Sequence, residues 1–174
     1  MIQLYFGSNL FAKTFRSSMS FLNEDLSSRF LDVILEYSET HEDLTPLSKA
    51  NNLKLLLDCL STGSLASKLA SCMLLSNVCG TYPDVKPLVA EHFDSVVDLI
   101  LLVDFVEVYR SGKPGWIISL LDLLTSLLPV LTHEMLPPTW PALKRKLQMS
   151  AKLSFDPVLQ RHLELLAPEL EQYD

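Results

Sequence analysis

Residues 66–103, ASKLASCMLLSNVCGTYPDVKPLVAEHFDSVVDLILLV, decide the fold that this sequence predicts. Apolar side chains in and just before this stretch recur at steps of three and four residues, which is the spacing of one helix face. They are Leu65, Leu69, Cys72, Leu75 and Cys79. Gly80 follows the last of them, and glycine suits the left-handed residue that ends many helices. The pattern therefore predicts a helix from Leu65 to Gly80.

The rest of this stretch predicts a short helix and then a longer one. Pro83 interrupts the pattern, because proline lacks the N–H that a helix interior needs. A short helix is predicted over Val85–Glu91, and a longer one runs from Phe93 to about Val108. Acidic residues fall between the apolar ones of the longer helix, and we expect these to face solvent. They are Asp94, Asp98 and Glu107.

Similar patterns extend outward on both sides. Upstream, one amphipathic helix is predicted from Asn23 to Thr40, and a second begins at Thr45 and Pro46 and runs to Leu60. Downstream, residues 111–115 read as a loop. After this loop the sequence predicts a nearly all-apolar helix at the middle of the core, a short basic helix, and a last helix that Asp156 caps and Pro168 ends or bends. Their ranges are Trp116–Leu131, Trp140–Met149 and Pro157–Leu170.

The first twenty residues are ambiguous. Ile2, Leu4 and Tyr5 favour a strand, whereas Phe11 and Phe15 are spaced as one helix face. After residue 20 no segment alternates strictly with period two, so no sheet is predicted. A chain of 174 residues fits one domain, in which roughly 70% of the unfolded surface can be buried. We therefore expect a single all-α domain over residues 1–174, with residues 1–20 of uncertain structure.

The chain is rich in apolar residues, which form 48% of it, and its net charge is −7. A negative net charge disfavours nonspecific binding to nucleic acid. No stretch reaches the roughly 18 uninterrupted apolar residues of a membrane helix, since the best candidate carries Asp122 and Pro129. The first residues, MIQLYFGSNLFAK, lack the basic start of a signal peptide. We therefore expect a cytoplasmic or nuclear protein that does not enter a membrane.

The stretch Ala66–Val103 resembles an armadillo repeat. Leu75–Gly80, reading LSNVCG, is similar to the signature of the third helix of that repeat, and Val85–His92 and Phe93–Val103 resemble the first and second helices of the next one. Trp116–Thr132 would then be the next third helix. The resemblance to the armadillo/HEAT-type α-solenoid superfamily covers about one repeat well. It implies a short right-handed stack of helices in which the two third helices lie side by side and parallel.

Armadillo-type stacks hold partner proteins, and the resemblance therefore implies a non-enzymatic scaffold or adaptor that binds a peptide or helix on its concave surface. Asn77 takes the place of the asparagine that contacts a bound peptide backbone, although it could equally bridge loops within the fold. Armadillo proteins that bind peptides often carry a tryptophan where this sequence has Met73, and an asparagine where it has Ser126. Trp116 and Trp140 are further candidates for partner contact, or else pack the starts of their helices. The aromatic residues near the N-terminus are a candidate surface for self-association: Tyr5, Phe6, Phe11 and Phe15.

A second hypothesis is that the C-terminal part binds nucleic acid or another acidic ligand. Thr139–His162 contains five basic residues and one acidic residue, Asp156. The simpler interpretation is a solvated helix face. The candidate basic patch comprises Lys144, Arg145, Lys146, Lys152 and Arg161.

The sequence contains no pattern that predicts catalysis, a cofactor or a metal site. No glycine-rich phosphate motif occurs. His133 and Glu134 begin like a zinc-protease motif, but Pro137 takes the place of its second histidine. Cys59, Cys72 and Cys79 fall in apolar helical patterns, which is typical of reduced core residues. We therefore expect a protein that is not an enzyme and needs no cofactor.

Overall fold

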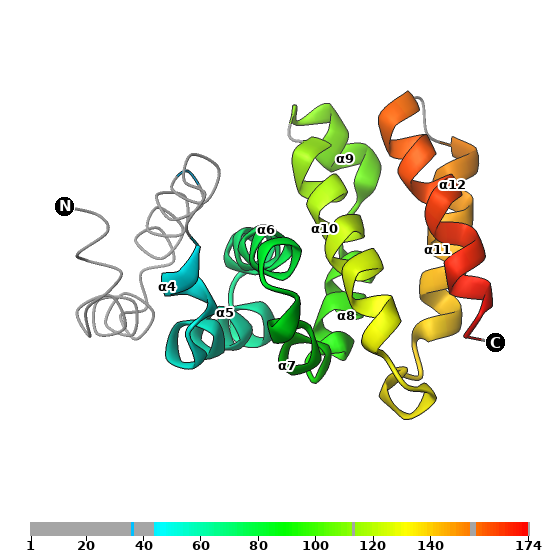
Figure 1. The fold of residues 1–174 in the computed structure, drawn as a ribbon. Coiled ribbons are helices and arrows are strands. Elements are labelled where there is room, and N and C mark those ends of the chain that lie inside the picture. Colours follow the sequence, from blue (N-terminus) through cyan, green and yellow to red (C-terminus); the bar gives the residue numbers. More distant parts are fainter. Residues whose placement is uncertain (1–35, 37–43, 113, 154–155, 174) are drawn as a thin grey trace. The chain divides into compact units, whose positions relative to one another are not determined.

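A computed structural model describes residues 36, 44–112, 114–153 and 156–173 (Figure 1). Every regular element in these residues is an α-helix or a 3-10 helix, which confirms the all-α class. Only Glu36 of the helix predicted from Asn23 to Thr40 is described, and it is helical. The ambiguous residues 1–20, with their four aromatic residues, lie outside the described part. The chain divides between Val85 and Lys86 into two compact units, where the sequence predicted one domain. This division falls inside the stretch 66–103, and each unit is described by itself.

Residues 44–85 of the first unit form a helical hairpin with a short helix before it and a 3-10 turn after it. Its elements are α4 (Thr45–Ser48), α5 (Ala50–Thr62), α6 (Leu65–Thr81) and η1 (Pro83–Val85). α5 packs against both α4 and α6. The two long helices carry buried leucines and all three cysteines, which are also buried. The hydroxyl groups of Thr45 and Tyr82 lie 2.9 Å apart and join the start of α4 to the end of α6.

The helix predicted from Thr45 to Leu60 is broken at Lys49, whose backbone is extended with ψ 136°. Two side chains satisfy carbonyl groups that a continuous helix would have used. The Ser48 hydroxyl donates to the Thr45 carbonyl at 2.9 Å, and the buried Asn52 amide donates to the Pro46 carbonyl at 2.8 Å. Such local side-chain bonds compete with helical backbone bonds. The single predicted helix is therefore two helices, α4 and α5.

α6 confirms the helix predicted from Leu65, but its end differs. The Ser64 hydroxyl caps the start of α6 by accepting from the Ser67 N–H. Gly80 was expected to adopt the left-handed conformation, yet it is an ordinary helical residue and α6 continues to Thr81. The helix ends because Pro83 disfavours the helical conformation for the residue before it, Tyr82, whose ψ is 85°.

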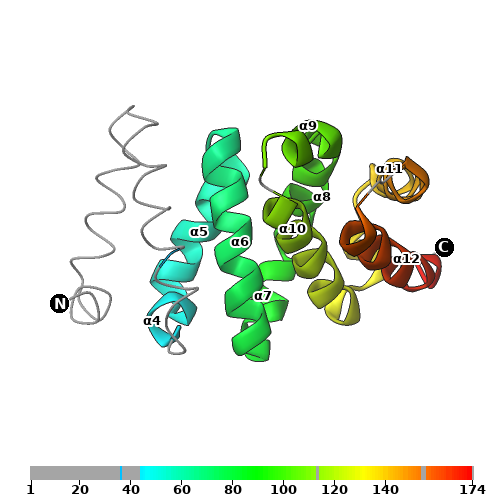
Figure 2. The ribbon, with the colours of Figure 1, turned by 90° about the horizontal axis from the view of Figure 1, so that it is seen from above.

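The second unit holds two layers of long helices. Its elements are α7 (Lys86–Ala90), α8 (Phe93–Leu102), α9 (Phe105–Arg110), α10 (Pro114–Leu127), η2 (Leu128–Val130), η3 (His133–Met135), α11 (Trp140–Leu153) and α12 (Pro157–Glu171). α8 and α10 form one layer, α11 and α12 form the other, and α8 contacts α11 while α10 contacts α12 (Figures 1 and 2).

α10 is the central helix of this second unit, as its sequence predicted. It contacts α7, α8, α9 and α12. Six of its apolar side chains are buried: Ile117, Leu120, Leu121, Leu123, Leu124 and Leu127. The predicted helix Trp116–Leu131 begins earlier, at Pro114, and its last turn is the 3-10 helix η2 around Pro129.

The long helix predicted from Phe93 to Val108 is two helices, α8 and α9. Asp104 separates them, because its carboxylate accepts hydrogen bonds from the Val106 and Glu107 N–H groups at 2.9 and 3.1 Å. An aspartate in this position caps a new helix start. The three acidic residues expected to face solvent, Asp94, Asp98 and Glu107, are exposed.

The last helix begins as predicted, since the Asp156 carboxylate accepts from the Val158 and Leu159 N–H groups. Pro168 was predicted to end or bend this helix; it does not end it, because α12 continues to Glu171, and the bend stays a prediction. α11 is longer than the short basic helix predicted to Met149 and ends at Leu153.

No helix in the described ranges is long and apolar enough to cross a membrane. The predicted parallel arrangement of Leu65–Cys79 and Trp116–Leu131 concerns helices of different units and stays a prediction.

Leu75 is fully buried in α6, whereas Leu65 at the start of the same helix is 48% exposed. Leu75→Ala should lower the free energy of unfolding by about 2–5 kcal/mol, because it removes buried contacts and leaves a cavity. Leu65→Ala is the matched control and should cost far less. Chemical denaturation followed by circular dichroism measures both, and an equal loss in the two variants would contradict the position of Leu75 in the core.

Candidate protein-binding surface

Met73 and Asn77 lie one turn apart on α6 in the first unit, and both are partly exposed. Partial exposure is what contact with a bound peptide requires. The Asn77 carbonyl also accepts a hydrogen bond from the Thr81 hydroxyl at 2.9 Å. Ser126 lies on α10 in the second unit, so a face shared by Asn77 and Ser126 stays a prediction.

Trp116 and Ser126 are partly buried on α10. The Ser126 hydroxyl oxygen is inaccessible to water and has no hydrogen-bond partner among the described residues. The oxygen is therefore a buried polar atom of α10. Trp116 keeps part of its ring at the surface and remains a candidate for partner contact.

Trp140 lies in the core, whereas the sequence had suggested it either as a contact for a partner or as a residue that packs the start of its helix. Only 4% of it is exposed, and its ring centroid lies 5.8 Å from that of Phe93 on α8 and 6.2 Å from that of Tyr173. The Tyr173 hydroxyl donates to the Leu128 carbonyl. Trp140 thus fixes the start of α11 to α8 and to the end of the chain after α12.

Lys146 packs against its neighbours, unlike the exposed residues of the candidate basic patch. Its ammonium group donates to the Leu101 and Val103 carbonyls at 2.9 and 2.5 Å and lies 5.1 Å from the centre of the Phe105 ring. The last carbonyls of a helix lack partners within it, and a cation there also complements the helix dipole. Burial lowers the pKa of Lys146, and Asp104 partly opposes this shift. Lys146 therefore closes the end of α8 and joins it to α11.

The other basic residues are spread over two helices. Arg145, Lys152 and Arg161 are exposed, and Lys144 is partly buried. Lys144 and Lys152 line a groove that also contains the carboxylates Glu164 and Glu171 of α12. Acidic neighbours reduce the positive potential that a phosphate backbone would meet.

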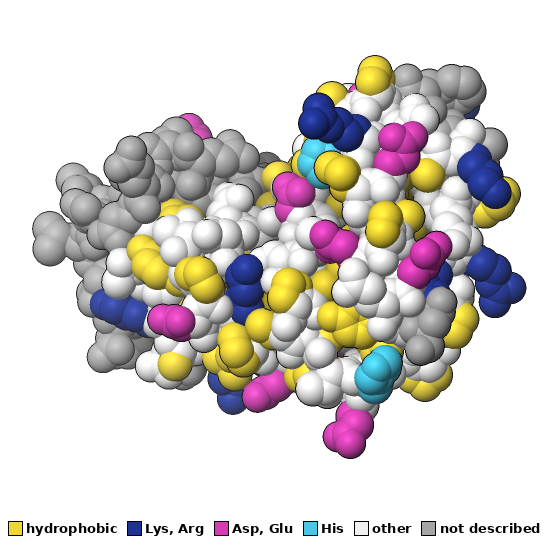
Figure 3. Space-filling model, turned by 45° about the vertical axis from the view of Figure 1, so that its right-hand side comes forward, with side chains coloured by type: hydrophobic (Ala, Val, Ile, Leu, Met, Phe, Trp, Pro, Cys, Tyr) yellow, Lys and Arg dark blue, Asp and Glu magenta, His cyan; other side chains and the backbone are white. Residues whose placement is uncertain are grey.

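The groove between α11 and α12 is open to solvent and has a volume of about 830 Å³. We call it the α11–α12 groove. Its apolar lining comes from Leu147 and Ala151 on α11 and from Leu163, Ala167, Pro168 and Leu170 on α12. Figure 3 shows that hydrophobic, basic and acidic side chains lie next to one another on the visible face of the second unit. Sequence reasoning missed this groove, although three-to-four-residue spacing of charged and small residues on both helices is visible in the sequence.

A second feature of the same unit is a group of exposed apolar side chains near the junction of α8 and α9. Leu102 is 64% exposed and Val106 51%. Leu102 and Val106 line a smaller hollow of about 390 Å³ together with Lys146 and Ser150. Large apolar side chains gathered at a surface often mark a site of contact with another protein.

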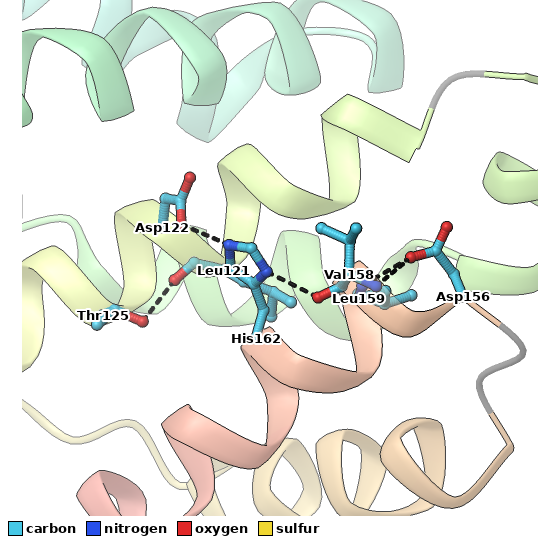
Figure 4. A network of polar contacts seen from close by, with 7 residues as sticks. All are labelled: Leu121, Asp122, Thr125, Asp156, Val158, Leu159 and His162. Atoms are coloured by element: carbon cyan, nitrogen blue, oxygen red, sulfur yellow. Dashed lines mark hydrogen bonds and ion pairs between the residues drawn. The ribbon is translucent and has the colours of Figure 1, made fainter.

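One polar network joins α10 to α12 (Figure 4). Nε2 of His162 lies 3.6 Å from a carboxylate oxygen of Asp122, and Nδ1 lies 2.8 Å from the Val158 carbonyl oxygen. A carbonyl oxygen only accepts, so Nδ1 carries a proton. The Thr125 hydroxyl donates to the Leu121 carbonyl at 2.9 Å. His162 therefore contacts α10 through Asp122 and its own helix through Val158, and Thr125 bonds within α10.

The three cysteines are buried. Burial raises the pKa of Cys59 to about 11, an effect that the Ser71 hydroxyl partly opposes, and burial also raises the pKa of Cys72. A thiol needs a lowered pKa and access to solvent to react readily. Within the described residues, no three side chains of the metal-binding types come together.

No protein-family model matches this sequence, and comparison with curated proteins and with solved structures likewise found no similar protein. The resemblance to armadillo repeats therefore rests on residues 66–103 alone.

Replacing Lys146 tests its role at the end of α8. Lys146→Met should lower the free energy of unfolding by about 1–3 kcal/mol, because two carbonyl groups lose their donor. Arg145→Met is the matched control, since Arg145 is exposed on the same helix, and its effect should stay within about 0.5 kcal/mol. Chemical denaturation of both variants measures the difference. Equal effects would show that the two carbonyl bonds do not stabilise the unit.

Asp122 gives a prediction about pH. Its side chain is 52% exposed, and the partial burial of the rest raises its pKa, which the attraction of His162 only partly offsets. The folded chain therefore holds the carboxyl proton more tightly than the unfolded chain, and the resulting penalty on folding grows as pH rises through the carboxyl range. Asp122→Asn should raise the melting temperature at pH 7, and the gain should shrink as pH falls toward about 2–3, where the carboxyl is protonated in both states.

Asp98→Asn, at an exposed position on α8, serves as the control for this experiment. Thermal unfolding across the pH range measures both variants. A lower melting temperature for Asp122→Asn at pH 7 would show that the ion pair with His162 outweighs the cost of burying the carboxylate.

Proposed function

We propose that this chain is a non-enzymatic interaction module that binds another protein. The observation that carries the proposal is the α11–α12 groove. It is open, about 830 Å³ in volume, and combines an apolar lining with charged residues. Sites that hold peptide helices are apolar grooves of this kind, in which polar groups at the edges select the partner.

The chemistry of the described residues supports a binding role over a catalytic one. A catalytic site needs a nucleophile or base together with a group that orients it. His162 contacts Asp122 and Val158, and the thiols of Cys59 and Cys72 are buried. The exposed side chains of Leu102, Val106 and Met149 instead offer apolar contact area.

The armadillo resemblance suggests a related version of the proposal, in which a peptide lies on the concave side of a helical stack. Asn77 and Met73 on α6 would contact that peptide in the first unit. Their partial exposure is compatible with this role. The two versions share the class of function and differ in the surface that the partner covers.

Nucleic-acid binding through the basic patch is the competing proposal, and the structure gives it less support. Lys146 is bonded to two carbonyl groups of α8, and Lys144 and Lys152 share their groove with Glu164 and Glu171. Binding to a generic duplex at low salt that falls steeply as salt rises would favour this competitor.

A photo-crosslinking amino acid placed at Gln148 tests the proposal, because Gln148 is exposed and lines the groove. In cells it should form a covalent adduct with one protein in stoichiometric amount. The same substitution at Gln160, an exposed glutamine of α12 outside the groove lining, is the matched control and should not form this adduct. Adding Ala151→Arg, which fills the groove with a charge, should abolish the adduct at Gln148. An adduct formed equally from both positions, or none from Gln148, would contradict the proposal.

A further inference from the structure

The lining residues of the α11–α12 groove follow helical spacing on both sides. On α11 they are Lys144, Leu147, Gln148, Ala151 and Lys152. On α12 they are Leu163, Glu164, Ala167, Pro168, Leu170 and Glu171. Each set recurs at steps of three and four residues, so each is one stripe along its helix. The groove is therefore a straight channel between two packed helices.

The base of the channel is apolar, and two of its lining side chains are small. Leu147, Leu163 and Leu170 are at most 3% exposed and form its base. Ala151 and Ala167 are partly exposed and carry only a methyl group each. The distance between packed helix axes, about 8–10 Å, depends on the side chains at the contact, and small ones permit the shorter distances. A third helix can thus approach closely at these two alanines.

The charges of the groove are sorted by helix. Both charged lining residues of α11 are basic, Lys144 and Lys152, and both of α12 are acidic, Glu164 and Glu171. We call these the basic rim and the acidic rim. A bound segment would meet opposite charges on its two sides, which selects partners by charge complementarity.

We infer that the α11–α12 groove accommodates one amphipathic α-helix of a partner protein, with an acidic flank along the basic rim and a basic flank along the acidic rim. The inference rests on the proposed function and adds the secondary structure and charge pattern of the partner. Apolar residues at positions i, i+3 or i+4, and i+7 of that helix fill the channel above the two alanines.

The two rims also fix the direction of the bound helix. Turning a helix end for end while its apolar face stays in the channel exchanges its two flanks. The acidic flank would then lie beside Glu164 and Glu171, and like charges at close range repel. Only one of the two directions is therefore complementary, and exchanging the charges of the rims should reverse the direction.

Two designed helical peptides of equal composition and equal apolar face test this inference on the full chain. The first peptide carries all its acids on one flank and all its bases on the other, and the second mixes them on both flanks. The first should bind about tenfold more tightly at low salt, since several exposed ion pairs each add a small contribution. The advantage should shrink as salt rises. Fluorescence anisotropy of labelled peptides measures both affinities.

Variants of the rims supply the second arm. Lys144→Glu with Lys152→Glu makes both rims acidic and should remove the advantage of the first peptide. Adding Glu164→Lys and Glu171→Lys exchanges the rims and should restore it with the helix reversed. A spin label at the N-terminus of the peptide should then broaden amide signals at opposite ends of α11 in the original and the exchanged chain. Melting curves check that each variant folds, and Ala167→Trp, which fills the channel, should abolish binding to the original chain.

Equal affinity for both peptides, or broadening at the same end in both chains, would overturn the inference. So would concentration-dependent self-association in sedimentation experiments that Ala167→Trp removes, because a second copy of the chain would then occupy the groove. If the crosslinker at Gln148 captures a protein while neither peptide binds, the proposed function stands and the helical partner is wrong.

Discussion

The burial of α10 is the constraint on which the second unit depends. This helix has apolar residues on almost every side, and exposed apolar surface is costly in water. Four other helices therefore surround it: α7, α8, α9 and α12. Because α12 packs against α10 and α11 packs against α8, α11 and α12 lie side by side in the second layer, and the groove lies between them. The groove thus depends on the leucines of α10, although none of them lines it.

Two side chains from distant parts of the sequence maintain the junction of α8 and α9. Asp104 caps the start of α9, and Lys146 of α11 closes the end of α8 by donating to Leu101 and Val103. A chain turn between helices leaves carbonyl and N–H groups without partners. The two side chains satisfy some of these groups and also keep Leu102 and Val106 exposed beside a shallow hollow. The same arrangement explains why Lys146, a residue of the candidate basic patch, packs against α8.

Function in such a fold is carried by surfaces. Contacts between helices such as the bonds of Lys146 to the Leu101 and Val103 carbonyls stabilise the second unit, and the cysteines are buried. The surfaces that remain, the α11–α12 groove and the apolar side chains near α8 and α9, have the composition of protein contact sites.

Several elements could be predicted from the sequence because their causes are local. The periodicity of Leu69, Cys72 and Leu75 produced α6, and the apolar composition of α10 predicted its central place. The cap at Asp156 also depends on bonds to residues within three positions of it. Local patterns therefore determined the all-α class, most helix starts and the burial of the cysteines.

Other features depended on how the helices pack against one another. Asn52 lies close in sequence to the Pro46 carbonyl, yet its buried amide acts only when α5 packs on α4. The sequence shows Lys146 as one of several basic residues, and only the approach of α11 to α8 places it against two carbonyl groups. The sequence left open whether Trp140 contacts a partner or packs the start of its helix, and its contacts with Phe93 and Tyr173 show that it packs. By itself the sequence determined which segments are helical, because helices follow from periodicity and capping. Tertiary packing decided which side chains remain exposed to a partner, because burial depends on neighbours far away in the chain.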